Sequence, residues 1–117
     1  HDEPHKRCWK KVYKYVGKIP TVRILGITSV SERRRIYIPK SVRELLGDSV
    51  SFSERGGRVA VERGGDRNID ERGRASIGRD ILERLGVGEG GCLVFLGDGK
   101  DVYLARLENV DAKVARG

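Results

Sequence analysis

The chain of 117 residues contains no methionine and no glutamine, and asparagine occurs only at Asn68 and Asn109. Aromatic residues make up 6% of the sequence, and no apolar run approaches the roughly 18 residues of a transmembrane helix. No hydrophobic segment of the signal-peptide type is present. We therefore expect a soluble cytoplasmic protein that does not associate with a membrane. Because methionine is absent, we also expect the natural N-terminus to lie upstream of His1.

Cysteine and histidine are equally scarce. Cys8 and Cys92 are too few for a zinc site of their own, and both histidines lie within the first five residues. No Ser-His-acid or Cys-His set is available for nucleophilic catalysis. We therefore expect a protein that is not an enzyme and holds no metal or cofactor. Isolated thiols are the favoured interpretation of the two cysteines, and a Cys8–Cys92 disulfide, which occurs in hyperthermophiles, is the alternative. The high share of charged residues, 35%, is typical of a thermophile.

Positive charge is in excess and unevenly distributed. The net charge is +7, from 24 lysines and arginines and 17 aspartates and glutamates. Residues 1–20 carry six basic and two acidic side chains, residues 21–65 carry nine and five, and residues 66–117 carry nine and ten. This bias favours a polyanionic partner, most often a nucleic acid, over a basic surface that serves solubility alone.

The sequence contains an internal repeat. Residues 31–47 read SERRRIYIPKSVRELLG, and residues 70–86, at an offset of 39, read DERGRASIGRDILERLG. After an insertion at 87–90 the register resumes at an offset of 43, which pairs Phe52 with Phe95. A unit of about 40 residues rarely forms a sufficient core alone. We therefore predict that both copies share one core, as a pseudo-dimer within one chain.

Both copies predict the same short elements. Strands are expected at 21–30, with a bulge at Gly26, and at 35–38, with a turn between them. A short helix is expected from Pro39 to Leu46, followed by a hairpin around Gly56-Gly57. The second copy repeats this plan and ends in a hairpin with strands at 93–96 and 102–105. The predicted apolar helix stripes are Val42, Leu45 and Leu46 in the first copy and Ile81 and Leu85 in the second.

The repeat divides the chain into four parts. These are a basic aromatic arm at 1–20, a first repeat at 21–65, a second repeat at 66–107 and a frayed tail at 108–117. Trp9, Val12, Tyr13 and Val16 have helical spacing, which favours a short basic amphipathic helix in the arm. Three roles stay open for it: cover for the core, contact with nucleic acid, and binding of a second copy or a protein partner.

The order of motifs resembles the AbrB/MazE/SpoVT family of small regulators. The resemblance spans about 40 residues of the first copy and rests on Glu32, Arg35, Ile38-Pro39, Arg43 and Leu46-Gly47. The second copy agrees at Asp70-Glu71, Gly73-Arg74 and Leu85-Gly86, but Gly78 stands where proline is usual. The resemblance implies a mainly β fold, a swapped-hairpin β-barrel. Tandem fusion is expected to close this barrel within one chain.

The resemblance also implies a DNA-binding surface on the first turns and the nearby strand and helix ends. By position it points to Arg33, Arg35, Lys40 and Arg43 in the first copy and to Arg67, Arg72, Arg74 and Arg79 in the second. Arg34 departs from the small residue usual at its position and adds charge. Leu82 stands where the first copy has Arg43, and Asp80 and Glu83 are acidic, so we expect the second half to bind DNA less well.

The arginines indicate the same function independently of the family resemblance. Three consecutive arginines on an exposed turn reach several phosphates, because the guanidinium group matches phosphate geometry. We therefore expect a protein that binds double-stranded DNA in the nucleoid, as a transcriptional regulator or small chromatin-type protein. The alternative is a protein-interaction module of the antitoxin type, without catalytic activity.

Overall fold

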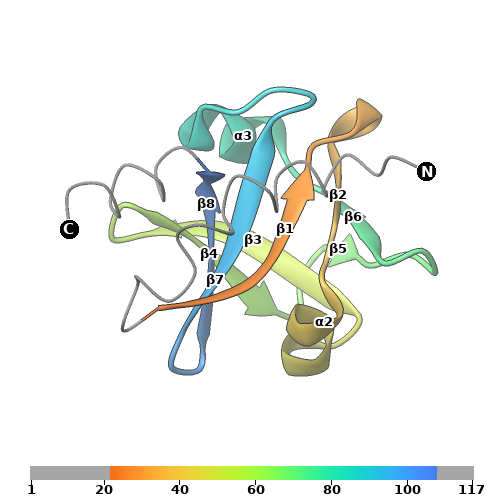
Figure 1. Cartoon of the computed structure of the whole chain (residues 1–117). Coiled ribbons are helices and arrows are strands. Elements are labelled where there is room, and N and C mark those ends of the chain that lie inside the picture. Colours follow the sequence, from red (N-terminus) through yellow and green to blue (C-terminus); the bar gives the residue numbers. More distant parts are fainter. Residues whose placement is uncertain (1–21, 108–117) are drawn as a thin grey trace.

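The structure, a computed structural model, describes residues 22–107; the arm, Cys8 and the tail lie outside this range. The described chain is mainly β (Figure 1). Its elements in chain order are β1 (Arg23–Ser29), the 3-10 turn η1 (Glu32–Arg34), β2 (Arg35–Tyr37), α2 (Lys40–Leu46), β3 (Ser49–Arg55), β4 (Arg58–Arg63), β5 (Arg67–Asn68), β6 (Arg74–Ser76), α3 (Arg79–Leu85), β7 (Cys92–Asp98) and β8 (Asp101–Arg106).

Six strands form one antiparallel sheet that curls into a half-barrel. Its strand order is β1-β7-β8-β4-β3-β5, and β2 pairs with β6 in a separate two-stranded sheet (Figure 1). The strands and both helices that the sequence predicts are present, and the bulge in β1 occurs between Ile24 and Gly26. The first strand that this plan gives to the second copy is present only as the two-residue β5. No bounds were predicted for it, because a segment this short carries little periodic signal.

Strand pairing between the two copies follows the offsets of the sequence repeat. In the β2–β6 sheet, Ile36 lies opposite Ala75, the residue 39 positions later. In the β4–β8 pair, Ala60 lies opposite Tyr103, the residue 43 positions later. Two backbone hydrogen bonds also recur at an offset of 39, namely Ser31 N to Arg35 O and Asp70 N to Arg74 O. Equivalent segments of the two copies therefore occupy equivalent positions in the sheets.

The outer strands of the half-barrel pair in a reciprocal way. The first strand of the first copy, β1, pairs with β7 of the second copy, and Thr28 lies opposite Leu93. The short β5 of the second copy pairs with β3 of the first, and Arg67 lies opposite Val50. Each copy thus contributes its first strand to an edge built on the other copy.

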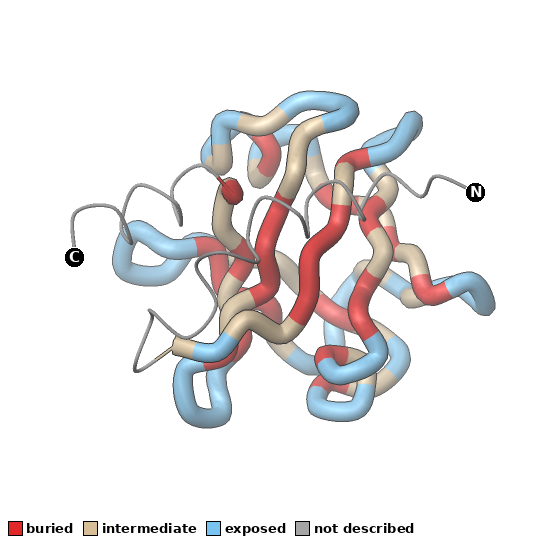
Figure 2. The backbone as a smooth tube through the Cα atoms, in the orientation of Figure 1, coloured by how far each residue is buried: buried red, intermediate tan, exposed pale blue. Residues whose placement is uncertain are grey.

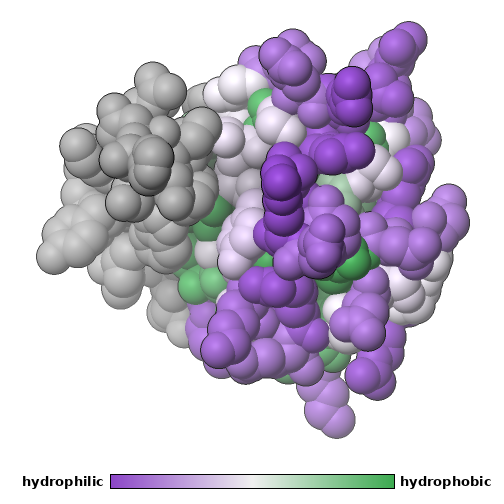
Figure 3. Space-filling model, turned by 90° about the vertical axis from the view of Figure 1, so that its right-hand side faces the viewer, coloured by the Kyte–Doolittle hydropathy of each residue, from purple (hydrophilic) through white to green (hydrophobic). Residues whose placement is uncertain are grey.

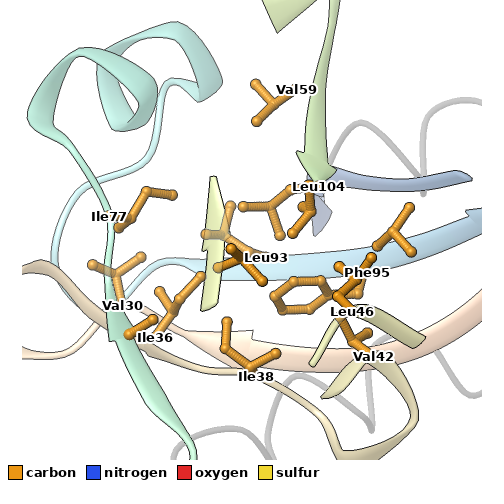
Figure 4. Close-up of a cluster of buried hydrophobic side chains, with 14 of the residues drawn as sticks. Val30, Ile36, Ile38, Val42, Leu46, Val59, Ile77, Leu93, Phe95 and Leu104 are labelled. Carbon is orange, nitrogen blue, oxygen red and sulfur yellow. The ribbon is translucent and has the colours of Figure 1, made fainter. Parts of the chain in front are cut away.

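The main hydrophobic core lies between the half-barrel and the β2–β6 sheet (Figures 2 and 4). Both copies contribute to it, as the sharing of one core requires. Phe95, Ile36 and Ile38 are fully buried, and the labelled side chains of Figure 4 converge from segments of both copies, including the helix α2. A second, smaller cluster of Ile27, Val94 and Leu107 lies apart from this core.

The helix stripes differ from the predicted ones. Leu45 is 48% exposed, whereas Val42 and Leu46 are buried, so the stripe of α2 is narrower than predicted. In α3 the buried residue is Leu82, while Ile81 and Leu85 are only partly buried against the core. Both helices have seven residues, about two turns, and only one side of so short a helix reaches the core.

Gly26 is required by a close approach between β1 and the start of α2. A Cβ atom at this position would lie 2.2 Å from Pro39 Cγ, so any side chain would displace the proline ring. The bulge at Gly26 and the Ile38-Pro39 segment are therefore parts of one packing arrangement.

The prediction of isolated thiols was wrong. Cys92, at the start of β7, is disulfide-bonded and has no free thiol. Sequence spacing alone does not reveal a disulfide, because its formation depends on the distance between backbone segments that are far apart in sequence.

No helix among residues 22–107 is long and apolar enough to cross a membrane. This finding is limited to the part of the chain that the structure describes.

The two neighbouring leucines of α2 provide a test of the core. We expect Leu46→Ala to lower the free energy of unfolding by about 2–5 kcal/mol, because it removes a buried side chain. Leu45→Ala is the matched control, and we expect it to change stability by no more than about 0.5 kcal/mol. Urea unfolding followed by circular dichroism measures both, and equal losses in the two variants would contradict this description of the core.

Candidate nucleic-acid interface

The two-stranded sheet of β2 and β6, hereafter the ribbon, has one buried and one solvent-accessible face. Ile36 and Ala75 are buried at its centre. Because side chains alternate along a strand, the residues on either side of them belong to the opposite face. These residues are partly exposed, and they are Arg35 and Tyr37 of β2 and Arg74 and Ser76 of β6. The accessible face of the ribbon therefore carries two arginines at equivalent positions of the two copies.

A turn precedes each strand of the ribbon, and the two turns lie at opposite ends of it. The first turn comprises residues 31–34 and the second comprises residues 70–73. Both project from the same side of the molecule (Figure 1) and are mostly exposed (Figure 2). Figure 3 shows that this side is largely hydrophilic, with small hydrophobic patches among the polar residues.

The first turn holds two arginines in an unusual backbone conformation. Arg33 has a φ of 65° and Arg34 a φ of 55°. Residues with a Cβ atom disfavour this left-handed region by about 1–2 kcal/mol. The turn is held by the Ser31 hydroxyl, which donates a hydrogen bond of 3.0 Å to the carbonyl oxygen of Arg35. Both arginine side chains are exposed, and no ion pair involves either of them within residues 22–107.

The second turn is organised around a carboxylate. Asp70 Oδ1 accepts hydrogen bonds of 2.9 Å from the backbone N–H groups of Arg72 and Arg74. These hydrogen bonds, that of Arg74 first, and the charges of Arg74 and Arg35 lower the pKa of Asp70, against a smaller opposing effect of desolvation. Asp70 Oδ2 also lies 3.7 Å from the Nε atom of Arg74. Part of the positive charge of Arg74 is therefore neutralised locally.

Each turn is attached to the helix of the other copy. The backbone N–H of Ile77, shortly before α3, donates to the carbonyl oxygen of Arg34 at 2.8 Å. In the equivalent contact, the N–H of Ile38, shortly before α2, donates to the carbonyl oxygen of Gly73 at 2.7 Å. The exposed Arg79 therefore starts the helix beside the first turn, and the exposed Lys40 starts the helix beside the second.

Two of the predicted arginines are held by neighbouring groups. The Arg43 guanidinium donates to Ile38 O at 3.0 Å and to the Tyr37 hydroxyl at 2.9 Å, and it lies 5.4 Å from the centre of the Tyr37 ring. Arg67 donates to Ser76 Oγ at 3.1 Å and lies 3.9 Å from Asp66 Oδ1. Arg43 thus belongs to the end of the ribbon that carries the second turn, and Arg67 to the other end.

The nine basic residues predicted from the sequence fall into two groups. The exposed ones are Arg33, Arg34, Lys40, Arg72 and Arg79, and the partly buried ones are Arg35, Arg43, Arg67 and Arg74. The turns, the ribbon and the two helix starts bring all nine to the ribbon and its two ends. Sequence reasoning missed Tyr37 and Ser76, although the alternation of polar and apolar residues in Arg35-Ile36-Tyr37 indicates that Tyr37 shares the accessible face.

No group of three or more His, Cys, Asp or Glu residues in the described range could hold a metal ion.

No protein-family model matches the chain, and no curated protein matches its sequence.

The backbone of the first turn leads to a stability test. Arg34→Gly relieves about 1–2 kcal/mol of left-handed strain but adds about 0.4–1 kcal/mol of unfolded-state entropy. We expect a net gain of up to about 1.5 kcal/mol in the free energy of unfolding, measured in urea. The neighbouring Arg35→Gly is the matched control: Arg35 has a φ of −98°, and glycine within a strand lowers stability by about 0.5–1 kcal/mol. A lower free energy of unfolding for Arg34→Gly would contradict the interpretation that the backbone at Arg34 is strained.

The lowered pKa of Asp70 predicts that its contribution to stability depends on pH. Because its folded-state pKa is lowered, its contribution to stability is full above the unfolded pKa of about 3.9 and is lost as the pH falls through the folded pKa. We expect Asp70→Ala to lower the Tm by a constant amount between about pH 7 and pH 5, and this difference to shrink below about pH 4. Glu71→Ala, which removes a neighbouring carboxylate, is the control. A Tm difference that persists at about pH 2 would contradict the assignment.

Proposed function

We propose that this chain binds double-stranded DNA, as a transcriptional regulator or a small chromatin-type protein. The observation that carries the proposal is the position of both arginine turns on one side of the molecule, at the two ends of one ribbon. A basic surface of this kind neutralises several phosphates of one duplex at once, because guanidinium groups fit phosphate oxygens. Phosphate contacts supply affinity and orientation and carry little sequence information.

The strand pairing supports a swapped-hairpin barrel made of two tandem repeats. In this interpretation the repeats interleave, since each lends its first strand to the other through β1–β7 and β3–β5. The recurrence of pairings at the offsets of 39 and 43 favours an approximate two-fold axis that passes near Ile36–Ala75 and near Ala60–Tyr103. The axis relates the two turns and sets the distance between them.

A two-stranded ribbon with an accessible basic face also suits a duplex. The major groove of B-DNA is wide enough to admit a two-stranded β-ribbon. Arg35 and Arg74 on the accessible face are then nearest to the base edges, and the exposed arginines of the turns are nearest to the phosphates on either side.

Fluorescence anisotropy of a labelled random-sequence duplex, measured with the full chain at several salt concentrations, tests the function. We expect the logarithm of the affinity to fall linearly with the logarithm of the salt concentration, with a slope of about −0.9 for each phosphate contacted. Changing Arg33→Ala, Arg34→Gly and Arg35→Ala together removes up to three contacts. We therefore expect a slope that is less steep by about 2–3 and an affinity at least tenfold weaker at low salt.

The control for charge is the pair Arg63→Ala and Lys100→Ala, which removes two positive charges where the test variant removes three, so the losses are compared per charge removed. Both residues line a pocket beside β4 and β8, belong to neither turn, and take part in no ion pair of the described residues. We expect this control to keep most of the affinity. Equal weakening by both variants would reduce the binding to a non-specific effect of charge, and absence of binding at low salt would overturn the proposal.

A further inference from the structure

We call the end of the ribbon that carries the first turn the first end, and the end that carries the second turn the second end. The two ends are built from equivalent positions but carry different side chains. Where the first end has Arg34, the second has Gly73. Beside these positions, and contributed by the other copy, the first end has Ser76 and Leu82, and the second has Tyr37 and Arg43. The two ends therefore differ at three pairs of equivalent residues, and the paired side chains differ in size and charge.

These differences depend on one another through space. A Cβ atom on Gly73 would lie 2.9 Å from Tyr37 Cε1 and 3.2 Å from Arg43 Cζ. Gly73 also has a φ of 81°, which favours glycine. At the first end the small Ser76 and the buried Leu82 stand in place of Tyr37 and Arg43, and Arg34 keeps an exposed side chain. Tyr37 and Arg43 therefore leave no space for a side chain at position 73 of the second turn. The first end lacks this pair, so position 34 of the first turn can carry a side chain.

Each end therefore presents a cation in a different way. At the first end the cation is Arg34, which projects from the turn and takes part in no ion pair among the described residues. At the second end it is Arg43, which extends from α2 and is fixed by two hydrogen bonds and a ring contact. Arg74 of the second end is also partly neutralised by Asp70. The first turn thus carries two exposed guanidinium groups, Arg33 and Arg34, and the second turn carries one, Arg72.

We propose that the protein recognises a non-palindromic DNA sequence and binds it in one orientation, with the first end as the stronger contact. This inference rests on the proposed function. A symmetric protein reads two identical half-sites, because its two-fold axis coincides with that of the duplex. Here the backbone keeps the approximate axis while Arg34, Tyr37 and Arg43 break it, so the two half-sites are expected to differ. On the accessible face Arg35 lies opposite Ser76 and Arg74 lies opposite Tyr37, so different side chains meet the base edges on the two sides and specify different bases.

Selection of bound duplexes from a random library by the full chain tests the inference. We expect a consensus whose two halves are not inverted copies of each other. A palindromic consensus would overturn the inference and leave the proposed function intact. Failure to bind any duplex at low salt would overturn the proposed function, and the inference with it.

Two matched variants then assign the orientation. Arg33→Ala with Arg34→Gly weakens the first end, and Lys40→Ala with Arg72→Ala removes two exposed cations from the second. On the selected duplex we expect each variant to lose hydroxyl-radical protection at one end only, and at opposite ends. We also expect the first variant to weaken binding at least threefold more than the second. Equal losses of affinity, with protection lost symmetrically, would overturn the assignment.

A variant that restores symmetry provides the reciprocal test. Gly73→Arg with Tyr37→Ser and Arg43→Leu copies the first end onto the second. Thermal unfolding first establishes that this variant folds, and selection is then repeated. We expect a consensus whose two halves are closer to inverted copies than those of the natural chain. A folded variant with an unchanged consensus would contradict the role of these three residues.

Discussion

The antiparallel pairing of β2 with β6 is the contact on which the rest of the structure depends. Its two strands come from segments 39 residues apart, and its buried centre, Ile36 opposite Ala75, joins the core that both copies share. Because the strands run antiparallel, the turn before each strand lies beside the helix that follows the other strand. A single register thus sets the core, the separation of the turns and the basic residues gathered at each end. A slip of one residue would turn Arg35 and Tyr37 inward, and the cost of burying them would exclude it.

The strand pairing of this protein repeats between the two copies, whereas the side chains of the accessible face do not. The backbone pairs equivalent residues with each other at Ile36–Ala75 and at Ala60–Tyr103, and both copies supply apolar residues to the core, although their sizes differ. On the accessible face the copies diverge, and the divergence concerns residues that contact one another, such as Gly73 and the Tyr37–Arg43 pair. In a homodimer both ends would be identical. Two repeats in one chain allow each end to change independently while the core, which needs both copies, remains the same.

Charge at the interface is divided between free and restrained groups. Exposed arginines without a carboxylate partner keep long flexible side chains, which in the proposed function adapt to phosphates on a duplex. Restrained arginines such as Arg43 lose this freedom on folding and not on binding. Surface ion pairs elsewhere, including Arg55 with Glu62 at 2.7 Å and Arg84 with Glu54 at 2.5 Å, contribute little to stability because water screens them. The left-handed backbone at Arg33 and Arg34 lowers stability at the first turn, which in the proposed function is also a DNA contact.

The sequence by itself determined the repeat, the positions of the longer strands, both helices, the bulge at Gly26 and the two arginine-bearing turns. These features depend on neighbours within a few residues, through alternation, β-branched residues, proline and glycine. Only the tertiary structure decided that Leu45 is exposed, that Cys92 is disulfide-bonded and that Leu82 is buried. It also decided that Arg43 lies beside the second turn, although in sequence it follows the first. These facts depend on which distant strands pair, and no local pattern of residues specifies that choice.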